Sequence, residues 1–251
     1  IHLAAVIPPV TETNKALATK VNVDATLSLI KLIESSESCN RFIFASSVAV
    51  HGKDQTVREP PLTPESPYMP DDHYGETKLA CELAIKESSL DWTVLRICVS
   101  PPVSIDFIAG NHDHKMIFDI SPDCRIEYVH PQDCALGFAN AVDTDESIKR
   151  ILLLGGGESC QVNGLDFNNG LISALNVPPM PRDVFDPGKP SFYGDYMDTA
   201  ESQRILQYQQ HSFQDAIAES AQAYGAIRHA IKIVGPAVRF FMVRQSPFYK
   251  K

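Results

Sequence analysis

Compact apolar runs alternate with longer segments of helical periodicity in the first hundred residues of the chain. The compact runs are rich in β-branched and aromatic residues, which predicts strands that are buried on both faces. In the longer segments apolar residues recur every three or four positions, which predicts amphipathic helices. Because strands that alternate with helices usually pair in parallel, the pattern indicates an α/β fold with helices on both faces of the sheet. The predicted strands are residues 1–5 (the end of a strand), 41–47 and 92–97, and the predicted helices are residues 12–36 and 72–89, the latter capped by Asp71 or Asp72.

The second half of the chain continues with shorter elements. We predict a strand at residues 125–129, followed by a helix that has Pro131 in its first turn. Further helices are predicted at residues 163–175, 199–207 and 212–224. We expect these elements to build a smaller lobe that gives a substrate site its shape. Its candidate lining residues are Phe192, Tyr193 and Tyr196.

Residues 226–251 mix apolar with basic side chains. Gly235 and Pro236 lie in the middle of this tail and predict a break into two short helices. Two interpretations are open: the tail packs against the rest of the protein or another subunit, or it lies as a basic amphipathic anchor on a membrane surface. We favour packing, because burial in a core or an interface is the commoner fate of such stripes.

Composition narrows the functional classes. With 251 residues, of which 44% are hydrophobic, the chain can bury the core of one large domain or of a domain and a half. A net charge of −9 offers no basic surface for nucleic acid. The 6 cysteines form no C-x-x-C pair, so we predict reduced thiols in a cytoplasmic protein. Residues 111–114 include two histidines without further ligands at a suitable spacing, so we expect no metal.

A tyrosine and a lysine at the start of the second long helix are the strongest candidates for chemistry. Tyr74 and Lys78 are four residues apart, which places both side chains on one helix face. A phenol with a pKa near ~10 is a poor acid or base at neutral pH, and a nearby ammonium should lower that pKa. Ser47, at the end of a predicted strand, offers a hydroxyl that can hold a substrate oxygen. The carboxyl ends of parallel strands share one edge of the sheet, so these groups can converge on one cleft.

Several short motifs extend this pattern. In chain order they are His2-Leu3-Ala4-Ala5, Asn22-Val23, Ser46-Ser47-x-x-Val50-His51-Gly52, Tyr74-x-x-x-Lys78, Leu95-Arg96, Glu127-Tyr128-Val129-His130-Pro131-Gln132-Asp133-Cys134-Ala135 and Leu153-Leu154-Gly155-Gly156-Gly157. In this order and spacing, the chain resembles the extended short-chain dehydrogenase/reductases, also called the NAD-dependent epimerase/dehydratase family. The resemblance covers roughly residues 1–225.

The resemblance implies an enzyme that uses NAD or NADP on a small-molecule substrate. It implies that Ser47 hydrogen-bonds the substrate oxygen, that Tyr74 transfers the proton, and that Lys78 lowers the pKa of Tyr74 and binds the nicotinamide ribose. For Asn22, a structural role is at least as well supported as a chemical one. The implied cofactor-binding residues are Leu3, Ala4, Ala5, Ala45, Ser46, Tyr74, Lys78, Ile97 and Cys98, and the implied substrate-binding residues are Ser47, His51 and Val99.

Three departures from the family pattern bear on this assignment. The family's first βαβ unit has a glycine-rich G-x-x-G-x-x-G turn that holds the pyrophosphate, and this turn is absent near the start of the chain. We therefore expect that on the order of 60 to 70 residues, about two βα units, are missing. Val99 replaces an asparagine that contacts substrate in many sugar-nucleotide enzymes, which weakens that assignment. His51 stands where the family usually has tyrosine; it could titrate near neutral pH, but we favour a packing role.

We therefore expect a Rossmann-like doubly wound parallel sheet whose N-terminal part is missing, with a smaller C-terminal α/β substrate lobe. The leading function is an oxidoreductase or epimerase that acts on a secondary alcohol or ketone. The alternatives are a catalytically inactive nucleotide-binding or scaffold protein, and an incomplete fragment that cannot bind cofactor. The family also suggests a homodimer through the two long helices. The expected domains are residues 1–150 (partial NAD(P)-binding domain, with 99–124 reaching into the lobe), 151–225 (lobe) and 226–251 (tail).

Overall fold

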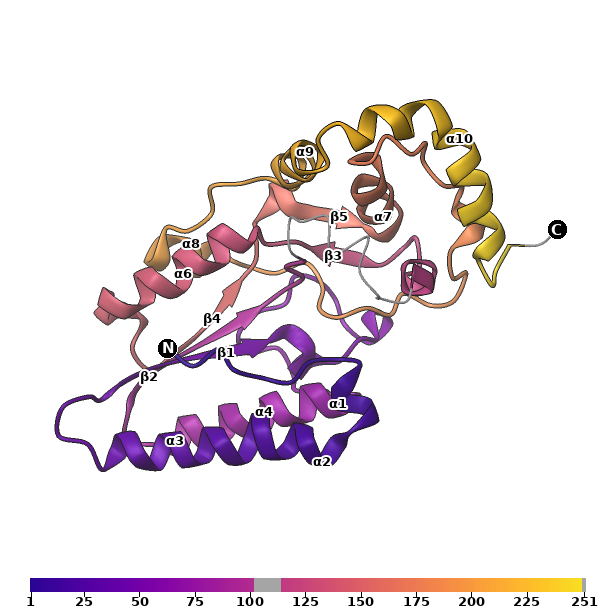
Figure 1. Cartoon of the computed structure of the whole chain (residues 1–251). Helices are drawn as coiled ribbons and strands as arrows, with labels where there is room; N and C mark the ends of the chain where they lie inside the picture. Colours follow the sequence, from indigo (N-terminus) through magenta and orange to yellow (C-terminus); the bar gives the residue numbers. More distant parts are fainter. Residues whose placement is uncertain (102–113, 250–251) are drawn as a thin grey trace.

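The computed structural model describes residues 1–101 and 114–249, and a parallel sheet lies at its centre (Figure 1). Within the described residues this main sheet has three strands, in the order β1 (Arg41–Ser47), β2 (Asp91–Ile97) and β4 (Arg150–Leu154). β1 and β2 are paired along their whole length, so that Ser47 lies opposite Ile97. The predicted first strand contributes one isolated parallel bridge, in which His2 pairs with Phe44 of β1.

Helices cover both faces of the main sheet, because successive side chains of a strand point to opposite faces. On β1, Phe42 and Phe44 pack on one face and Ile43 and Ala45 on the other. The first face is covered by α3 (Ala25–Glu34) and α4 (His73–Glu87), and the second by α6 (Pro131–Asp143) and α8 (Ala200–Leu206) (Figure 1). This arrangement confirms the predicted Rossmann-like, doubly wound α/β fold.

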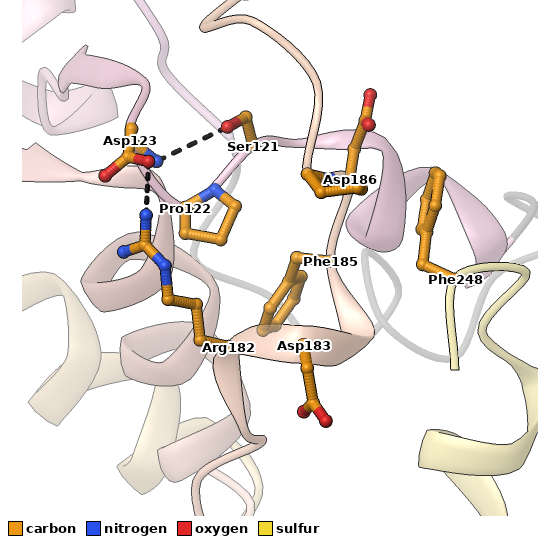
Figure 2. Close-up of a pocket in the computed structure, with 9 residues that line it drawn as sticks. Ser121, Pro122, Asp123, Arg182, Asp183, Phe185, Asp186 and Phe248 are labelled. Atoms are coloured by element: carbon orange, nitrogen blue, oxygen red, sulfur yellow. Dashed lines mark hydrogen bonds and ion pairs between the residues drawn. The ribbon is translucent and has the colours of Figure 1, made fainter. Parts of the chain in front are cut away.

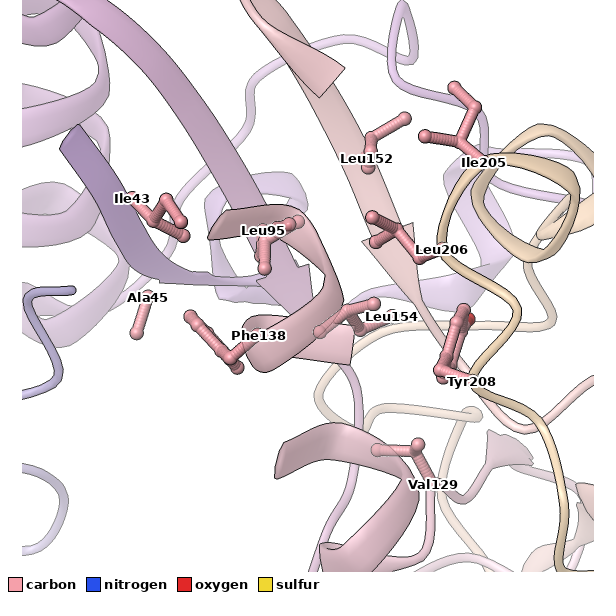
Figure 3. Packing of buried hydrophobic residues seen from close by; sticks show 11 residues of the cluster. Ile43, Ala45, Leu95, Val129, Phe138, Leu152, Leu154, Ile205, Leu206 and Tyr208 are labelled. Atoms are coloured by element: carbon pink, nitrogen blue, oxygen red, sulfur yellow. The ribbon is translucent and has the colours of Figure 1, made fainter. Parts of the chain in front are cut away.

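Figure 3 shows the core between the main sheet and α6 and α8. Phe138 of α6 and Leu206 of α8 belong to one buried cluster with Leu95 of β2. Burying a side chain of this size contributes about 1.5–3 kcal/mol, so the cluster fixes the two helices against the sheet. Tyr208 is fully buried in the same core, and its hydroxyl donates a hydrogen bond to the carbonyl oxygen of Gly155 at 2.7 Å.

The long helix predicted at residues 12–36 is divided in the structure. It consists of α1 (Val10–Thr13), α2 (Lys15–Ala18), a π-helical segment (Thr19–Asp24) and α3. Asn14 begins α2 by accepting a hydrogen bond from the backbone N–H of Leu17 at 3.1 Å. The π-helical segment contains the buried Asn22, and π-helical turns are frequent at functional sites. Apolar spacing predicts the helix but not its wider turn.

The smaller lobe is built on an antiparallel strand pair, β3 (Arg125–Glu127) and β5 (Gln161–Asn163). Pro131 is in the first turn of α6, as predicted. The lobe's core joins α7 (Gly164–Ser173) to α9 (Phe213–Ala223), where the rings of Phe167 and Phe213 stack with centroids 5.6 Å apart. The predicted strand at 125–129 is shorter, because Tyr128 leaves the pair and forms a parallel bridge with Val99.

The predicted boundary between residues 150 and 151 does not follow the architecture. β4 begins at Arg150 and pairs in parallel with β2, so it is a strand of the main sheet. α8 packs on the same sheet through Ile205 and Leu206. Residues 151–154 and 200–206 therefore belong with the main sheet and not with the lobe. The remaining division into a partial Rossmann domain, a lobe and a tail stays a proposal.

The prediction that the tail divides into two short helices is wrong. α10 (Ile227–Gln245) is one helix with Pro236 inside it, and Figure 1 shows that it is bent. Its inner side packs on the lobe through Ile231 and Val243. Gly235 is buried, and a Cβ there would come within 2.8 Å of the carbonyl oxygen of Asn176. Tertiary packing of this side keeps the segment helical across the proline. No helix in residues 1–101 or 114–249 is long and apolar enough to cross a membrane.

Gly52 ends the turn after β1 in a backbone conformation that residues with a side chain rarely adopt, with φ 74° and ψ 179°. A Cβ there would also overlap the carbonyl oxygen of Met69. Gly225 has φ 52° and no atom within 4 Å of its Cβ position, so it serves as a matched control.

We expect Gly52→Ala to lower the free energy of unfolding by at least about 2 kcal/mol more than Gly225→Ala. Both substitutions carry the strain of a positive φ, about 1–2 kcal/mol, and only the first adds steric overlap. Urea denaturation of the two variants measures the difference. Equal losses would show that the contact with Met69 relaxes at no cost.

Candidate active site

Ser47 lies at the carboxyl end of β1, where the chain turns into a short 3-10 helix (Val48–His51). Its hydroxyl caps that helix by accepting a hydrogen bond from the backbone N–H of Ala49 at 3.2 Å. The residue is 9% exposed. The turn therefore holds the hydroxyl at the strand end, which is the edge where sheets of this type bind ligands.

α4 brings Tyr74 to this hydroxyl. Asp72 caps α4 by accepting a hydrogen bond from the backbone N–H of Gly75 at 2.8 Å. Gly75 lies directly against the 3-10 turn, since a Cβ there would come within 2.6 Å of the carbonyl oxygen of Ala49. The absence of a side chain at this position allows the helix to approach the end of β1. The Tyr74 phenol lies close enough to the Ser47 hydroxyl for that hydroxyl to lower its pKa.

Lys78 lies one turn further along α4, on the same side of the helix. Its Nζ donates a hydrogen bond to the carbonyl oxygen of Ala45 at 2.7 Å and lies 5.8 Å from the ring centroid of Tyr74. The residue is 4% exposed. Burial lowers the pKa of Lys78 to about 8, although Cys81 and Glu82 act in the opposite direction. The structure thus brings the side chains of Ser47, Tyr74 and Lys78 together.

Lys78 is not among the groups that shift the pKa of Tyr74 in this structure, so its effect on that pKa stays a prediction. Burial raises the pKa of Tyr74 above its ordinary value; the Ser47 hydroxyl lowers it by less, and the charge of Asp72 raises it further. The Lys78 ammonium donates its hydrogen bond to a carbonyl oxygen, and burial of the phenol disfavours a phenolate. At neutral pH Tyr74 is therefore a protonated phenol.

The loop after His2 lies beside these groups, because hydrogen bonds hold both of its ends. At one end, the carbonyl oxygen of His2 accepts a hydrogen bond from the backbone N–H of Ala45 at 3.1 Å. At the other end, the Asn22 amide accepts from the N–H of Val6 at 2.7 Å and donates to its carbonyl oxygen at 2.9 Å. Asn22 also donates to Thr77 of α4 at 3.1 Å. These contacts give Asn22 the structural role that we considered.

The predicted cofactor-binding residues take different positions around this loop. Leu3 and Ala4 are exposed, and Ala5 is half-buried. Ile97 and Cys98 are half-buried at the end of β2. These five residues leave surface accessible at the strand ends.

Ser46 cannot offer its side chain to a cofactor. Its hydroxyl hydrogen-bonds the buried carboxylate of Glu82, and the residue is 2% exposed. Only its backbone atoms are left for the predicted contact. Ala45 likewise contributes a backbone carbonyl, which accepts the hydrogen bond of Lys78.

His51 and Val99, which we predicted as substrate contacts, are engaged in packing. His51 is 1% exposed, with Nδ1 2.9 Å from the carbonyl oxygen of Pro67 and Nε2 3.1 Å from Nη1 of Arg96. Burial lowers its pKa to about 4, so it does not titrate near neutral pH. Both ring nitrogens are used, which contradicts a substrate contact through either. Val99 is half-buried and packs against the core of the smaller lobe.

A contact between the lobe and the start of α4 was not visible in the sequence. The Tyr193 hydroxyl donates a hydrogen bond to the Asp72 carboxylate at 2.5 Å, and Lys53 Nζ lies 3.0 Å from the same carboxylate. Tyr193 thus lies at the helix terminus next to Tyr74. The only feature of the sequence that pointed to this contact was the run of aromatic residues that made Tyr193 a candidate lining residue. Of its neighbours, Phe192 packs in the lobe core and Tyr196 lines a groove of about 520 Å³.

A pocket of about 530 Å³ lies in the smaller lobe and not beside Tyr74 (Figure 2). Its apolar walls are Phe185 and Phe248. Figure 2 shows Arg182 pointing across to Asp123, with which it forms an ion pair. None of the three candidate catalytic side chains lines this pocket, so we do not assign the chemistry to it.

Among the described residues, one group has the composition of a metal site, namely His130, Asp133 and His211. Its polar atoms are engaged in hydrogen bonds: His130 Nδ1 accepts from the backbone N–H of Gln132 at 3.2 Å, and His211 Nδ1 lies 2.6 Å from Asp133. The two imidazole rings stack with centroids 4.2 Å apart. We interpret the group as a network that ties α6 to the segment before α9. Residues 111–113 of the other histidine-containing stretch lie outside the described residues.

Comparison with known proteins gives matches over part of the chain. The model of the NAD dependent epimerase/dehydratase family matches residues 1–103. D-erythronate dehydrogenase of Haemophilus influenzae is 25% identical over 159 residues, which cover 56% of this chain and 49% of that protein. UDP-glucose 4-epimerase 2 of Oryza sativa subsp. japonica is 31% identical over 85 residues, which cover 33% of this chain and 20% of that protein. The chain thus spans about half the length of the first of these curated relatives and less of the second.

Solved structures resemble the chain over most of its length at low sequence identity. UDP-glucuronic acid 4-epimerase from Bacillus cereus, in complex with UDP-glucuronic acid and NAD, has a TM-score of 0.70 and 18% identity, covering 89% of this chain and 74% of that one. A short-chain dehydrogenase/reductase superfamily protein from Agrobacterium tumefaciens with bound NAD has a TM-score of 0.71 and 16% identity, covering 92% of this chain and 80% of that one. These likenesses establish the fold.

Proposed function

We propose that this protein, whose residues 1–103 match the model of the NAD dependent epimerase/dehydratase family, oxidises, reduces or epimerises a secondary alcohol or ketone of a small molecule with NAD or NADP. The observation that carries the proposal is the proximity of the Ser47 and Tyr74 hydroxyls, with the Lys78 ammonium one helical turn away. A proton transfer at a carbonyl oxygen needs a group that holds the oxygen and an acid within hydrogen-bond reach. The two hydroxyls meet both needs.

Tyr74 is the proton donor or acceptor at the substrate oxygen in this proposal. Because its pKa is raised, the phenol is protonated at neutral pH and suited to donate a proton to a ketone oxygen as it becomes an alcohol. In the opposite direction the phenol must first lose its proton, so rising pH favours oxidation. Ser47 orients the substrate oxygen toward the phenol.

The surroundings of the site fit the nicotinamide half of the cofactor. A lysine ammonium has three N–H donors, and one of those of Lys78 goes to Ala45, so the others are suited to ribose hydroxyls. The exposed Leu3 and Ala4 and the half-buried Ile97 offer a wall at the strand ends, where such sheets bind nucleotides. When bound, the cofactor supplies the hydride donor or acceptor. The NAD in the Bacillus cereus and Agrobacterium tumefaciens structures supports this assignment.

The names of the relatives suggest the first substrates to test. D-erythronate and UDP-glucose are both polyhydroxylated, which supports a polyhydroxylated substrate for this protein.

A homodimer through α3 and α4 is part of the proposal. Leu32 of α3 and Leu83 of α4 are 67% and 48% exposed, which supports burial of these helices in a subunit contact.

Titration of the full-length native protein with NAD and with NADP tests the cofactor assignment. We expect micromolar binding of one of them, and at least about tenfold weaker binding by Lys78→Met, because the hydrogen bonds of a charged donor are lost. Lys86→Met on the same helix is the matched control, since Lys86 is exposed. If the native protein binds neither nucleotide, or if both variants bind equally well, the assignment is wrong.

A further inference from the structure

The outer side of α10 carries an apolar stripe that no described part of the protein covers. Its large side chains are Ile227, Ile233, Val234, Phe240 and Phe241, with exposed fractions of 54%, 83%, 50%, 53% and 65%. Together with the exposed Ala230 and Ala237, they recur every three or four residues, so they share one face of the helix. An exposed apolar patch of this kind marks an interaction surface.

α10 is therefore apolar on two sides. The inner side packs on the smaller lobe, as we expected for the tail, through Ile231, Val238, Met242 and Val243. That packing accounts for one apolar side only. The outer stripe has a different partner, because a helix of a soluble domain usually exposes a polar face there.

The charges along α10 indicate the chemistry of that partner. The helix has four Lys and Arg residues and no Asp or Glu, in a protein with a net charge of −9. Arg239 faces the lobe, where its Nε donates to the carbonyl oxygen of Pro179 at 2.7 Å. Lys232 is exposed, but it follows Arg228 by four residues and precedes Gly235 by three, which places it on the lobe side of the helix. Arg244 is exposed on the outer side, and its guanidinium lies 3.6 Å from the ring centroid of Phe240. A cation within an apolar stripe that contains aromatic rings is typical of helices that lie on anionic bilayers.

We propose that the outer face of α10 docks this protein on an anionic membrane surface. The apolar stripe enters the boundary between headgroups and acyl chains, and Arg244 contacts lipid phosphate. A second copy of the chain fits the face less well, because two α10 helices in contact would oppose like charges with no acid on either helix to pair them. Figure 1 places α10 on the outer side of the smaller lobe, away from α3 and α4, so a docked helix does not cover the helix that carries Tyr74.

Vesicle flotation with the native protein tests the proposal. We expect binding to vesicles of phosphatidylglycerol and phosphatidylcholine, little binding to phosphatidylcholine alone, and weaker binding as ionic strength rises. Phe240→Ser with Phe241→Ser should weaken binding at least about tenfold, because two aromatic rings no longer enter the bilayer. Arg244→Glu should weaken it several-fold, because the change reverses the charge at the lipid surface.

Two matched variants serve as controls. Val57→Ser with Met69→Ser removes side chains that are 54% and 48% exposed elsewhere, and Lys31→Glu reverses an exposed charge on α3. Both should bind as the unchanged protein does, and thermal unfolding should show that all variants are folded. The proposal fails if the protein does not float with anionic vesicles, if it binds both vesicle types equally, or if the α10 variants bind normally. A dimer in solution that only the phenylalanine variant disrupts, without vesicle binding, would assign the stripe to a second copy instead.

Discussion

Tyr74→Phe is expected to lower kcat by about 10²- to 10⁴-fold, the range that a positioned acid or base contributes. The substitution removes the hydroxyl that lies beside Ser47 and keeps the ring beside Lys78. The cofactor contact assigned to Lys78 is untouched, so the dissociation constant for NAD or NADP should change less than about twofold. Turnover of the native protein with D-erythronate, UDP-glucose or UDP-glucuronic acid, followed through the nicotinamide absorbance or the product, provides the measurement.

Tyr224→Phe is the control for loss of a phenol hydroxyl, because Tyr224 is buried in the smaller lobe with Ala174 and Ala221. It should retain the kcat of the unchanged protein. A Tyr74→Phe variant that turns over at the normal rate would remove Tyr74 from the mechanism. If turnover and cofactor binding are lost together, the substitution has disturbed the site as a whole and the proton-transfer role is not supported.

The central strands could be predicted from the sequence because burial on both faces leaves an uninterrupted apolar run. The strands predicted at 41–47 and 92–97 agree with β1 and β2 to within one residue. The cap of the second long helix was also predicted: Asp72, one of the two candidate caps, begins α4. The predictions failed where contacts between residues that are distant in the sequence determine the structure. A proline predicts a break, yet α10 continues through Pro236 because its inner side is held by the lobe.

The candidate site could be predicted in its geometry but not in its energetics. A spacing of four residues places Tyr74 and Lys78 on one side of a helix, and the structure shows both on that side. The direction of the Tyr74 pKa depends on how much water the surrounding segments exclude, and sequence spacing carries no such information. The same holds for His51, for which titration near neutral pH was the alternative to the favoured packing role. Burial lowers its pKa to about 4 because residues from the proline-rich loop and β2 enclose it.

A buried ion pair beneath the site links the strands to α4. Glu82 of α4 and Arg96 of β2 have fully buried side chains. Arg96 donates from Nε and Nη2 to the two carboxylate oxygens of Glu82, at 3.0 and 2.8 Å. The same guanidinium donates to the carbonyl oxygen of Pro64 at 2.9 Å and to the Tyr68 hydroxyl at 2.9 Å. Ser46 completes the set from β1, one residue before Ser47. The pair therefore connects the strand that carries Ser47 with the helix that carries Tyr74.

Arg96→Met is expected to lower the free energy of unfolding by about 3–5 kcal/mol, because it leaves the charge of Glu82 buried without a cation. Arg204→Met is the control: Arg204 pairs with Glu146, but both side chains are about half exposed, at 57% and 47%. That loss should stay below about 1 kcal/mol, since water already solvates both groups. Combining Arg96→Met with Glu82→Met should recover at least about 1 kcal/mol relative to Arg96→Met alone, because the unpaired charge is gone. Urea denaturation of the three variants and the unchanged protein gives these differences. A cost for Arg96→Met as small as that for Arg204→Met would mean that water or rearrangement reaches Glu82, and the pair would then not hold Ser47 and Tyr74 in register.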